Sequence, residues 1–121
     1  MNIETFRAFA ISLPHVTEDV KWGKDLCFCI SEKMFCVTGL EQKVFKVSLK
    51  VRPEEFDSLI EKKGIVPAPY LARHKWILIE DSTIFSREEW QYYVSQSYEL
   101  VKSKLPKKLL KELNRISFKS K

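Results

Sequence analysis

Residues 46–80 read KVSLKVRPEEFDSLIEKKGIVPAPYLARHKWILIE, and the changes of pattern within them decide the fold. Residues 43–50 predict a strand with one solvated side, because Phe45, Val47 and Leu49 alternate there with Lys46, Ser48 and Lys50. Pro53 then begins a predicted helix with acidic residues in its first turn and Gly64 at its end. After a connection pinned by two prolines, residues 75–80 predict a further strand.

The residues before this stretch predict one helix and two strands. Residues 2–13 carry an apolar stripe at helical spacing, and a proline follows them directly. Residues 26–30 and 34–38 predict two strands joined by a short, hairpin-like connection. Residues 15–25 are mostly polar, so we expect a loop there.

The residues after this stretch predict helices. Residues 86–89 form a capping box, Ser-Arg-Glu-Glu, which begins a long helix that ends before Pro106. Residues 107–116 have the spacing of a short basic amphipathic helix. The predicted order of helix, three strands, helix, strand and helix does not alternate as a parallel α/β fold would. We therefore expect an α+β fold, with an antiparallel sheet and helices packed on one face. Residues 1–106 form a single predicted domain, and residues 107–121 form a basic C-terminal tail.

Composition favours a folded protein of the reducing cytoplasm. The chain has 121 residues, of which 45% are hydrophobic, and no apolar run approaches the length needed to cross a bilayer. Three cysteines without a C-x-x-C spacing make a disulfide framework improbable. The net charge of +5 arises from residues 102–121, which hold eight Lys or Arg and one Glu. The high isoelectric point therefore belongs to the tail and not to the body.

A series of short motifs runs along the chain. The motifs are, in order, Pro14, Trp22, Met34-Phe35, Ser48-Leu49-Lys50 with Pro53-Glu54, Pro67-Ala68-Pro69-Tyr70, His74-Lys75-Trp76, Ser97-Tyr98 and Leu105-Pro106. This series resembles the MmcQ/YjbR family of small bacterial proteins over about residues 3–110. The resemblance implies a fold similar to the frataxin-like CyaY sandwich. It also implies the family's usual description, a DNA-binding protein with a "double wing", which rests on fold analogy.

Cations on the predicted strand over residues 43–50 are candidates for phosphate contacts. Lys46, Lys50 and Arg52 share one side of that strand and its exit, and same-side residues repeat at about 6.6 Å. This repeat is close to the spacing of phosphates along a nucleic-acid strand. Arg73 and His74 would widen the patch. An ordinary solvated sheet face with mixed charges is the alternative interpretation.

Three aromatic residues and three tail lysines complete the candidate set. Trp22, Tyr70 and Trp76 would stack on bases or line a ligand groove, although a position in the core, against the long helix, is favoured for Trp76. The tail contributes Lys107, Lys108 and Lys111, for which a solvated, frayed terminus is the alternative.

No motif predicts an enzyme. Ser97 lies on the apolar stripe of a helix, where close packing or a bond to the carbonyl four residues earlier explains it, and no Gly-x-Ser-x-Gly elbow is present. The cysteines are expected to be buried and free, and the predicted first helix lacks the acidic ridge of iron-binding frataxins. We therefore expect no cofactor or metal and, by default, a monomer. The first hypothesis is a non-enzymatic DNA-binding protein; the alternative is a module that binds a small molecule or protein in a groove.

Overall fold

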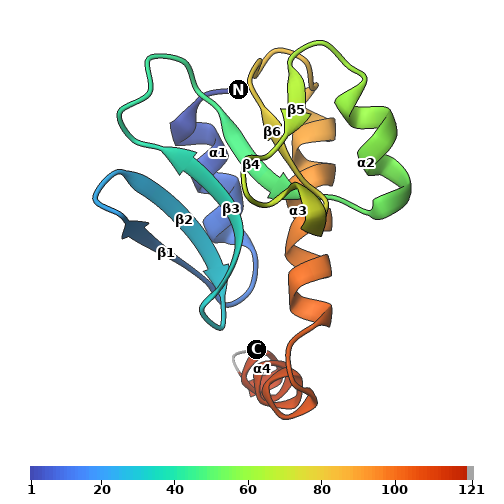
Figure 1. The fold of residues 1–121 in the computed structure, drawn as a ribbon. Coiled ribbons are helices and arrows are strands. Elements are labelled where there is room, and N and C mark those ends of the chain that lie inside the picture. Colours follow the sequence, from blue (N-terminus) through green and yellow to red (C-terminus); the bar gives the residue numbers. More distant parts are fainter. Residues whose placement is uncertain (120–121) are drawn as a thin grey trace.

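One sheet of six antiparallel strands carries the helices on a single side (Figure 1). The computed structural model describes residues 1–119. The elements are α1 (Ile3–Ser12), β1 (Val16–Lys21), β2 (Asp25–Ile30), β3 (Lys33–Gly39), β4 (Val47–Lys50), α2 (Pro53–Ile60), β5 (Ile65–Pro67), the 3-10 turn η1 (Ala72–His74), β6 (Trp76–Ile79), α3 (Arg87–Ser103) and α4 (Lys107–Lys119).

The strand order is β1-β2-β3-β4-β6-β5, and every neighbouring pair is antiparallel. In the register of β4 and β6, Leu49 lies opposite Ile77, and Lys50 lies opposite Trp76. Since side chains alternate along a strand, Leu49 and Ile77 face the core, whereas Ser48 and Lys50 face the other side. We call this second side, which also carries Leu78, the helix-free face.

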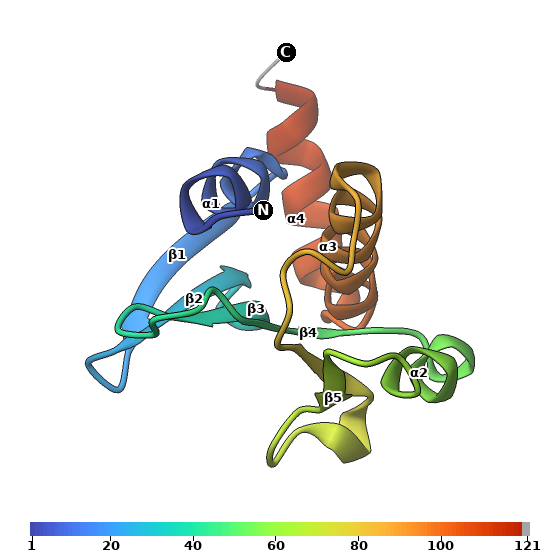
Figure 2. The ribbon, with the colours of Figure 1, turned by 90° about the horizontal axis from the view of Figure 1, so that it is seen from above.

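Apolar residues of the sheet and the helices form one core. Helix α3 packs against β2, β3 and β4, α1 against β1, and α2 against β5 and β6. Figure 2 shows α1, α3 and α4 together on one side of the strands. Phe6 of α1 meets Phe28 of β2 edge to face, with ring centroids 5.5 Å apart, and Trp90 of α3 at 6.0 Å. This packing confirms the predicted α+β class with helices on one face.

The helix starts follow the predicted capping signals, whereas α2 ends at Ile60 with Glu61 as its C-cap, and not at the predicted Gly64. Asn2 caps α1, because its Oδ1 accepts the Thr5 N–H at 2.8 Å. Ser86 and Glu89 form the predicted capping box at the start of α3. Pro53 occupies the first turn of α2, as expected.

Two strands contradict the sequence-based assignment. Residues 15–25 were expected to form a loop, but Val16–Lys21 is strand β1, paired along its whole length with β2. Its middle residues are exposed at the sheet edge, so no apolar alternation marked it. Strand β5 was also missed, because it is three residues long and ends at Pro67, at the opposite edge.

Two further boundaries are corrected. The strand predicted over residues 43–50 forms only over Val47–Lys50, with residues 43–46 in the connection before it. The tail begins with α4, whose Leu110 and Leu113 pack against the core. The side chain of Ile116, predicted for the apolar stripe of this helix, lies outside the described part, as do residues 120 and 121 of the tail.

Candidate functional site

One end of the sheet brings together cations that are far apart in sequence. Lys33 is the first residue of β3, Lys50 the last of β4, and Trp76 the first of β6. Because these neighbouring strands are antiparallel, all three residues lie at the same end of the sheet. The last turn of α3, with Lys104 as its C-cap, lies beside them.

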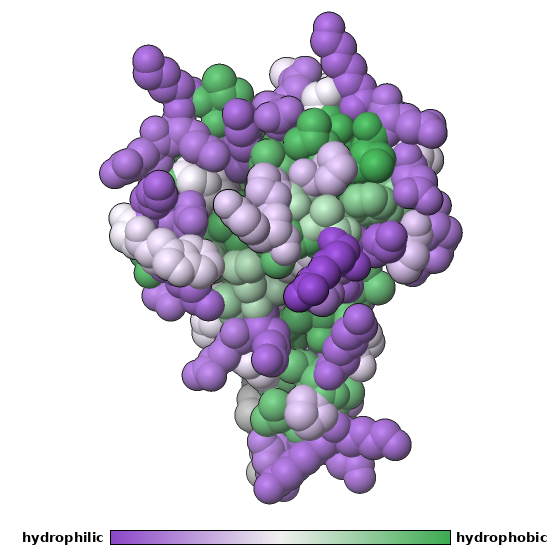
Figure 3. Space-filling view, in the orientation of Figure 1, coloured by the Kyte–Doolittle hydropathy of each residue, from purple (hydrophilic) through white to green (hydrophobic). Residues whose placement is uncertain are grey.

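Two adjoining hollows share Lys50, His74 and Lys104, and together we call them the basic groove. The larger hollow has a volume of about 590 Å³ and the smaller about 410 Å³. No acidic residue lines either one. Figure 3, which looks onto the helix-free face, shows green and pale residues over its middle, with strongly purple spheres among them and further purple residues around them. Charged and apolar groups therefore lie close together on this side. The other lining residues are Lys33, Met34, Val51, Pro53, Leu71, Arg73, Lys75, Trp76, Leu100, Val101, Leu105 and Pro106.

Lys50 and Lys104, which we call the lysine pair, lie side by side in this groove. Lys50 is half-buried, and its Nζ donates to the His74 carbonyl at 2.8 Å. Burial is the main cause that lowers the pKa of Lys50, and the positive charge of Lys104 lowers it further. Neither lysine forms an ion pair with a carboxylate within residues 1–119. Two unneutralised ammonium groups at one point attract an anion.

The residues of η1 extend the groove. Arg73 Nε donates to His74 Nε2 at 3.2 Å, which ties the two side chains together. Lys75 has a left-handed backbone with φ of +64°, and its ammonium lies over the Phe56 ring, 4.9 Å from the centroid. The guanidinium of Arg73 is exposed and remains available to a ligand.

Helix α3 holds the end of β4, and therefore Lys50, in place. Ser97 Oγ accepts the Lys50 N–H at 3.0 Å and donates to the Phe35 carbonyl at 2.6 Å. The hydroxyl thus bridges β3 and β4 where their ladder ends, one residue beyond the pair of Cys36 and Leu49. The close packing expected of Ser97 is confirmed by its complete burial. The bond expected to the carbonyl four residues earlier is replaced by these cross-strand bonds.

The three cations predicted to lie in a row along β4, Lys46, Lys50 and Arg52, have different surroundings in the structure. Lys46 Nζ lies 3.8 Å from a carboxylate oxygen of Glu80. Arg52 caps α2 and lines a separate hollow beside Tyr92, while its backbone N–H donates to Gln96 Oε1 at 3.0 Å. Of the residues chosen from sequence, only Lys50, Arg73, His74 and Trp76 line the basic groove. The tail residues Lys107, Lys108 and Lys111 lie exposed on α4 and line neither hollow.

The three aromatic candidates have different environments. Trp76 is 6% exposed, yet it lies opposite Lys50 on the helix-free face and outside the main core cluster, and it lines the larger hollow. Tyr70 is 99% exposed and has φ of +66° in the turn after Pro69, one residue before Leu71 of the groove. Trp22 is 71% exposed at the tip of the β1–β2 hairpin. It lines neither hollow, so the expected concavity around all three aromatics is not formed.

Sequence reasoning missed Lys104, Lys33 and Lys75 as members of the site. Lys104 was counted only within the tail's charge, although it is the closing residue of α3. The sequence does predict that Lys104 lies at the end of α3, because the capping box and Pro106 define the length of this helix. Its position beside Lys50, however, depends on how α3 crosses the sheet.

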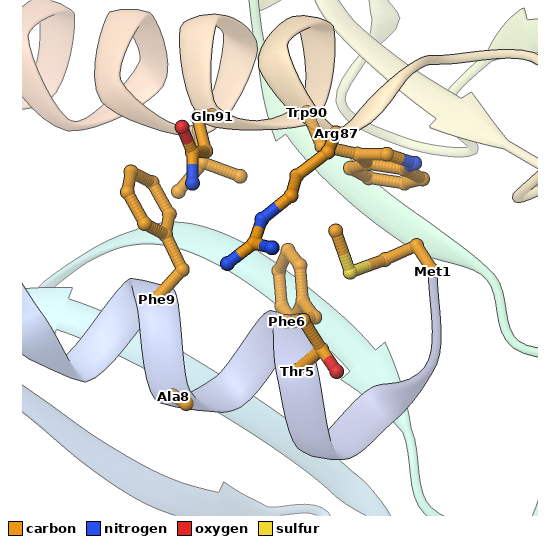
Figure 4. A pocket seen from close by; sticks show the side chains of 9 residues that line it. Met1, Thr5, Phe6, Ala8, Phe9, Arg87, Trp90 and Gln91 are labelled. Atoms are coloured by element: carbon orange, nitrogen blue, oxygen red, sulfur yellow. The ribbon is translucent and has the colours of Figure 1, made fainter.

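A further hollow, of about 230 Å³, lies between α1 and α3, and we call it the helical crevice. Its walls are mainly apolar, from Met1, Phe6, Phe9 and Trp90. Figure 4 shows the side chain of Arg87 extending from α3 across this hollow toward α1. The crevice therefore combines a cationic side chain with an apolar wall.

Within residues 1–119, the structure contains neither a metal-binding cluster nor a membrane-spanning helix. In this part of the chain, no group of three or more His, Cys, Asp or Glu is arranged to hold a metal ion. No helix within the same range is long and apolar enough to span a membrane.

A family model described as YjbR matches residues 11–100, which is the whole sheet together with α2 and most of α3. The chain belongs to the YjbR family. The resemblance seen in the short motifs is thereby confirmed. No curated protein matches the chain significantly.

Solved structures of similar proteins share the fold. A Deinococcus radiodurans protein, DR2400, with a DUF419 domain, has 26% identity and a TM-score of 0.85, and the match covers 93% of this chain and 88% of that one. A crystal structure of a Pseudomonas syringae protein has 23% identity and a TM-score of 0.70, over 84% of this chain and 99% of that one. A solution structure of a protein from Pseudomonas syringae has 25% identity and a TM-score of 0.66, and the match covers 84% of this chain and 93% of that one.

Proposed function

We propose that this YjbR protein binds nucleic acid through its phosphates, with the basic groove as the contact site. The observation that carries the proposal is the lysine pair, two adjacent ammonium groups without a carboxylate partner in a groove that no acidic residue lines. Phosphate contacts of Lys and Arg supply most of the affinity in sequence-independent binding. No nucleophile and base pair was recognised among the candidate residues, so we propose a binding function and not an enzyme.

Tyr70 supports the same proposal. A non-glycine residue with φ of +66° is uncommon, and the Tyr70 side chain is 99% exposed, so burial does not account for a tyrosine there. Exposed aromatic rings beside cations are typical platforms for stacked bases. Tyr70 directly precedes Leu71, which lines the larger hollow. It therefore adds a sequence-tolerant contact to the phosphate contacts of the lysine pair.

The test is a fluorescence anisotropy titration of a labelled 20-nucleotide strand and its duplex at several salt concentrations. We expect Lys104→Glu to weaken binding at least about tenfold and Lys104→Gln to reduce the salt slope by about 1. Lys102→Glu is the matched control, because Lys102 is in the same turn but lies over the Tyr98 ring, at 5.6 Å, and outside the groove. Equal losses for Lys104→Glu and Lys102→Glu would reject the groove as the contact site.

The contribution of the tail is tested by substitution and not by truncation. Deleting α4 would expose the core against which Leu110 and Leu113 pack. The variant with Lys107, Lys108 and Lys111 all changed to Gln removes charge and keeps the helix. If this variant binds no nucleic acid, the binding of the wild-type protein is due to electrostatic attraction by the tail and not to the basic groove.

The helical crevice supports a second candidate function, binding of a small apolar molecule with an acidic group. Its apolar walls and the overlying Arg87 complement such a ligand. Titration with octanoate, followed by thermal shift, tests this function. We expect Ala8→Trp to abolish the shift by filling the crevice. Ile11→Trp, an exposed change on the same helix outside the crevice, should preserve it. A shift that survives Ala8→Trp would eliminate this candidate.

A further inference from the structure

The lining of the larger hollow of the basic groove is part basic and part apolar. Its basic residues are Lys33, Lys50, His74 and Lys104. Its volume of about 590 Å³ lies within the range of small-molecule sites. We call its apolar lining residues together the apolar lobe; they are Met34, Leu71, Trp76, Val101, Leu105 and Pro106.

The apolar lobe has the chemistry of a site for a planar ring. Trp76 and Leu105 are each only 6% exposed, so their positions are fixed by packing. Rings of nucleobases gain affinity by contact with aromatic and apolar side chains, whichever base is present. A flat phosphate-binding surface would not need such a lobe.

The lysine pair lies between the two hollows, since both of its members line each of them. A phosphate held there has the apolar lobe on one side and the smaller hollow, with Arg73, on the other. The ligand that matches this order is one nucleotide unit, with its phosphate between the lysines and its base in the lobe. The smaller hollow then leaves room for the next phosphate of a strand.

We propose that the basic groove binds a single unpaired nucleotide, with the phosphate on Lys50 and Lys104 and the base against the apolar lobe. The inference rests on the proposed function and deepens it from phosphate attraction to a defined ligand. A base stacked inside a duplex cannot enter a groove of this kind without leaving the stack. The groove therefore selects single strands over duplexes, and it also accepts a free nucleoside monophosphate.

The first experiment uses the wild-type protein and four probes, followed by calorimetry and by tryptophan fluorescence. The probes are AMP, adenosine, inorganic phosphate and a 20-nucleotide single strand with its duplex as comparison. We expect AMP to bind at least about tenfold more tightly than inorganic phosphate, because base contact adds to the phosphate contact. AMP should also quench Trp76, which is assigned with Trp76→Phe. AMP affinity equal to that of inorganic phosphate would overturn the inference.

The second experiment separates the lobe from the charges. Val101→Trp fills the apolar lobe without a change of charge, and Leu71→Trp does so from a different segment of the chain if the first variant fails to fold. Ser103→Trp is the control, because Ser103 lies on α3 two residues away and lines a different hollow. We expect the lobe variants to lose at least about tenfold in AMP and single-strand affinity, and to keep their affinity for inorganic phosphate. Unchanged AMP binding in them would overturn the inference.

The outcomes distinguish this inference from the function on which it rests. Equal, Lys104-dependent binding of strand and duplex, with AMP no tighter than phosphate, overturns the nucleotide site and keeps the proposed function. Lobe-dependent AMP binding without any strand binding at low salt supports the nucleotide site and rejects the proposed function. A preference of at least about tenfold for the single strand, lost in Val101→Trp, supports both.

Discussion

Ser97→Ala is predicted to be costly, because one hydroxyl joins α3 to two strands. Its loss leaves the Lys50 N–H and the Phe35 carbonyl without the partners that they have at 3.0 and 2.6 Å. A buried backbone group without a partner costs about 1–3 kcal/mol, and the Lys50 amide is only partly buried. We therefore expect the free energy of unfolding to fall by about 2–4 kcal/mol. For 121 residues this corresponds to a fall in Tm of about 8–16 °C.

Urea unfolding followed by circular dichroism measures this loss. Ser103→Ala is the matched control, because the exposed Ser103 hydroxyl donates only to the Leu100 carbonyl of its own helix. We expect that control to change the free energy of unfolding by less than about 0.5 kcal/mol. If Ser97→Ala lowers the free energy of unfolding no more than Ser103→Ala does, the hydroxyl bridge between β3 and β4 does not stabilise the fold as predicted.

Three further perturbations follow from the same structure. Ser86→Ala should destabilise by about 1 kcal/mol in urea unfolding, since it removes the capping box of α3; no loss would contradict the assigned cap. Iodoacetamide at pH 8 should leave the folded protein unmodified, because burial raises the pKa of Cys27 to about 11 and also raises the pKa values of the other two thiols; mass spectrometry should show three additions only after unfolding. Lys104→Met should stabilise the protein at neutral pH by removing its repulsion of Lys50, whose pKa lies below 10.5 in the fold. Unfolding curves should show this gain disappear as pH rises toward 10.5, because the Lys50 ammonium loses its proton; a gain that persists there would contradict the assigned cause.

Local signals in the sequence were sufficient for the helices. The capping residues of α1 and α3 and Pro53 of α2 are short-range features whose physics does not depend on the rest of the fold. Strands β2 and β3 could also be predicted from the sequence, because they are short runs of mainly apolar residues that the fold buries.

Long-range packing explains what the sequence did not reveal. The edge strand β1 is polar and exposed, so its pairing with β2 left no periodic pattern. Lys46 and Lys50 looked equivalent, yet Glu80 neutralises one, and Lys104 stands beside the other. The lysine pair joins residues from β4 and the end of α3, so no local motif encodes it. The buried position of Trp76, by contrast, was one of the two interpretations open from sequence.

The most direct test of the account is an NMR titration of the ¹⁵N-labelled protein with a ten-nucleotide single strand at low salt. The account predicts that the largest amide shifts cluster at the basic groove, around Lys50, His74 and Lys104. Shifts confined to α4 around Lys107 and Lys108, or the absence of shifts, would contradict the groove as the site that binds nucleic acid.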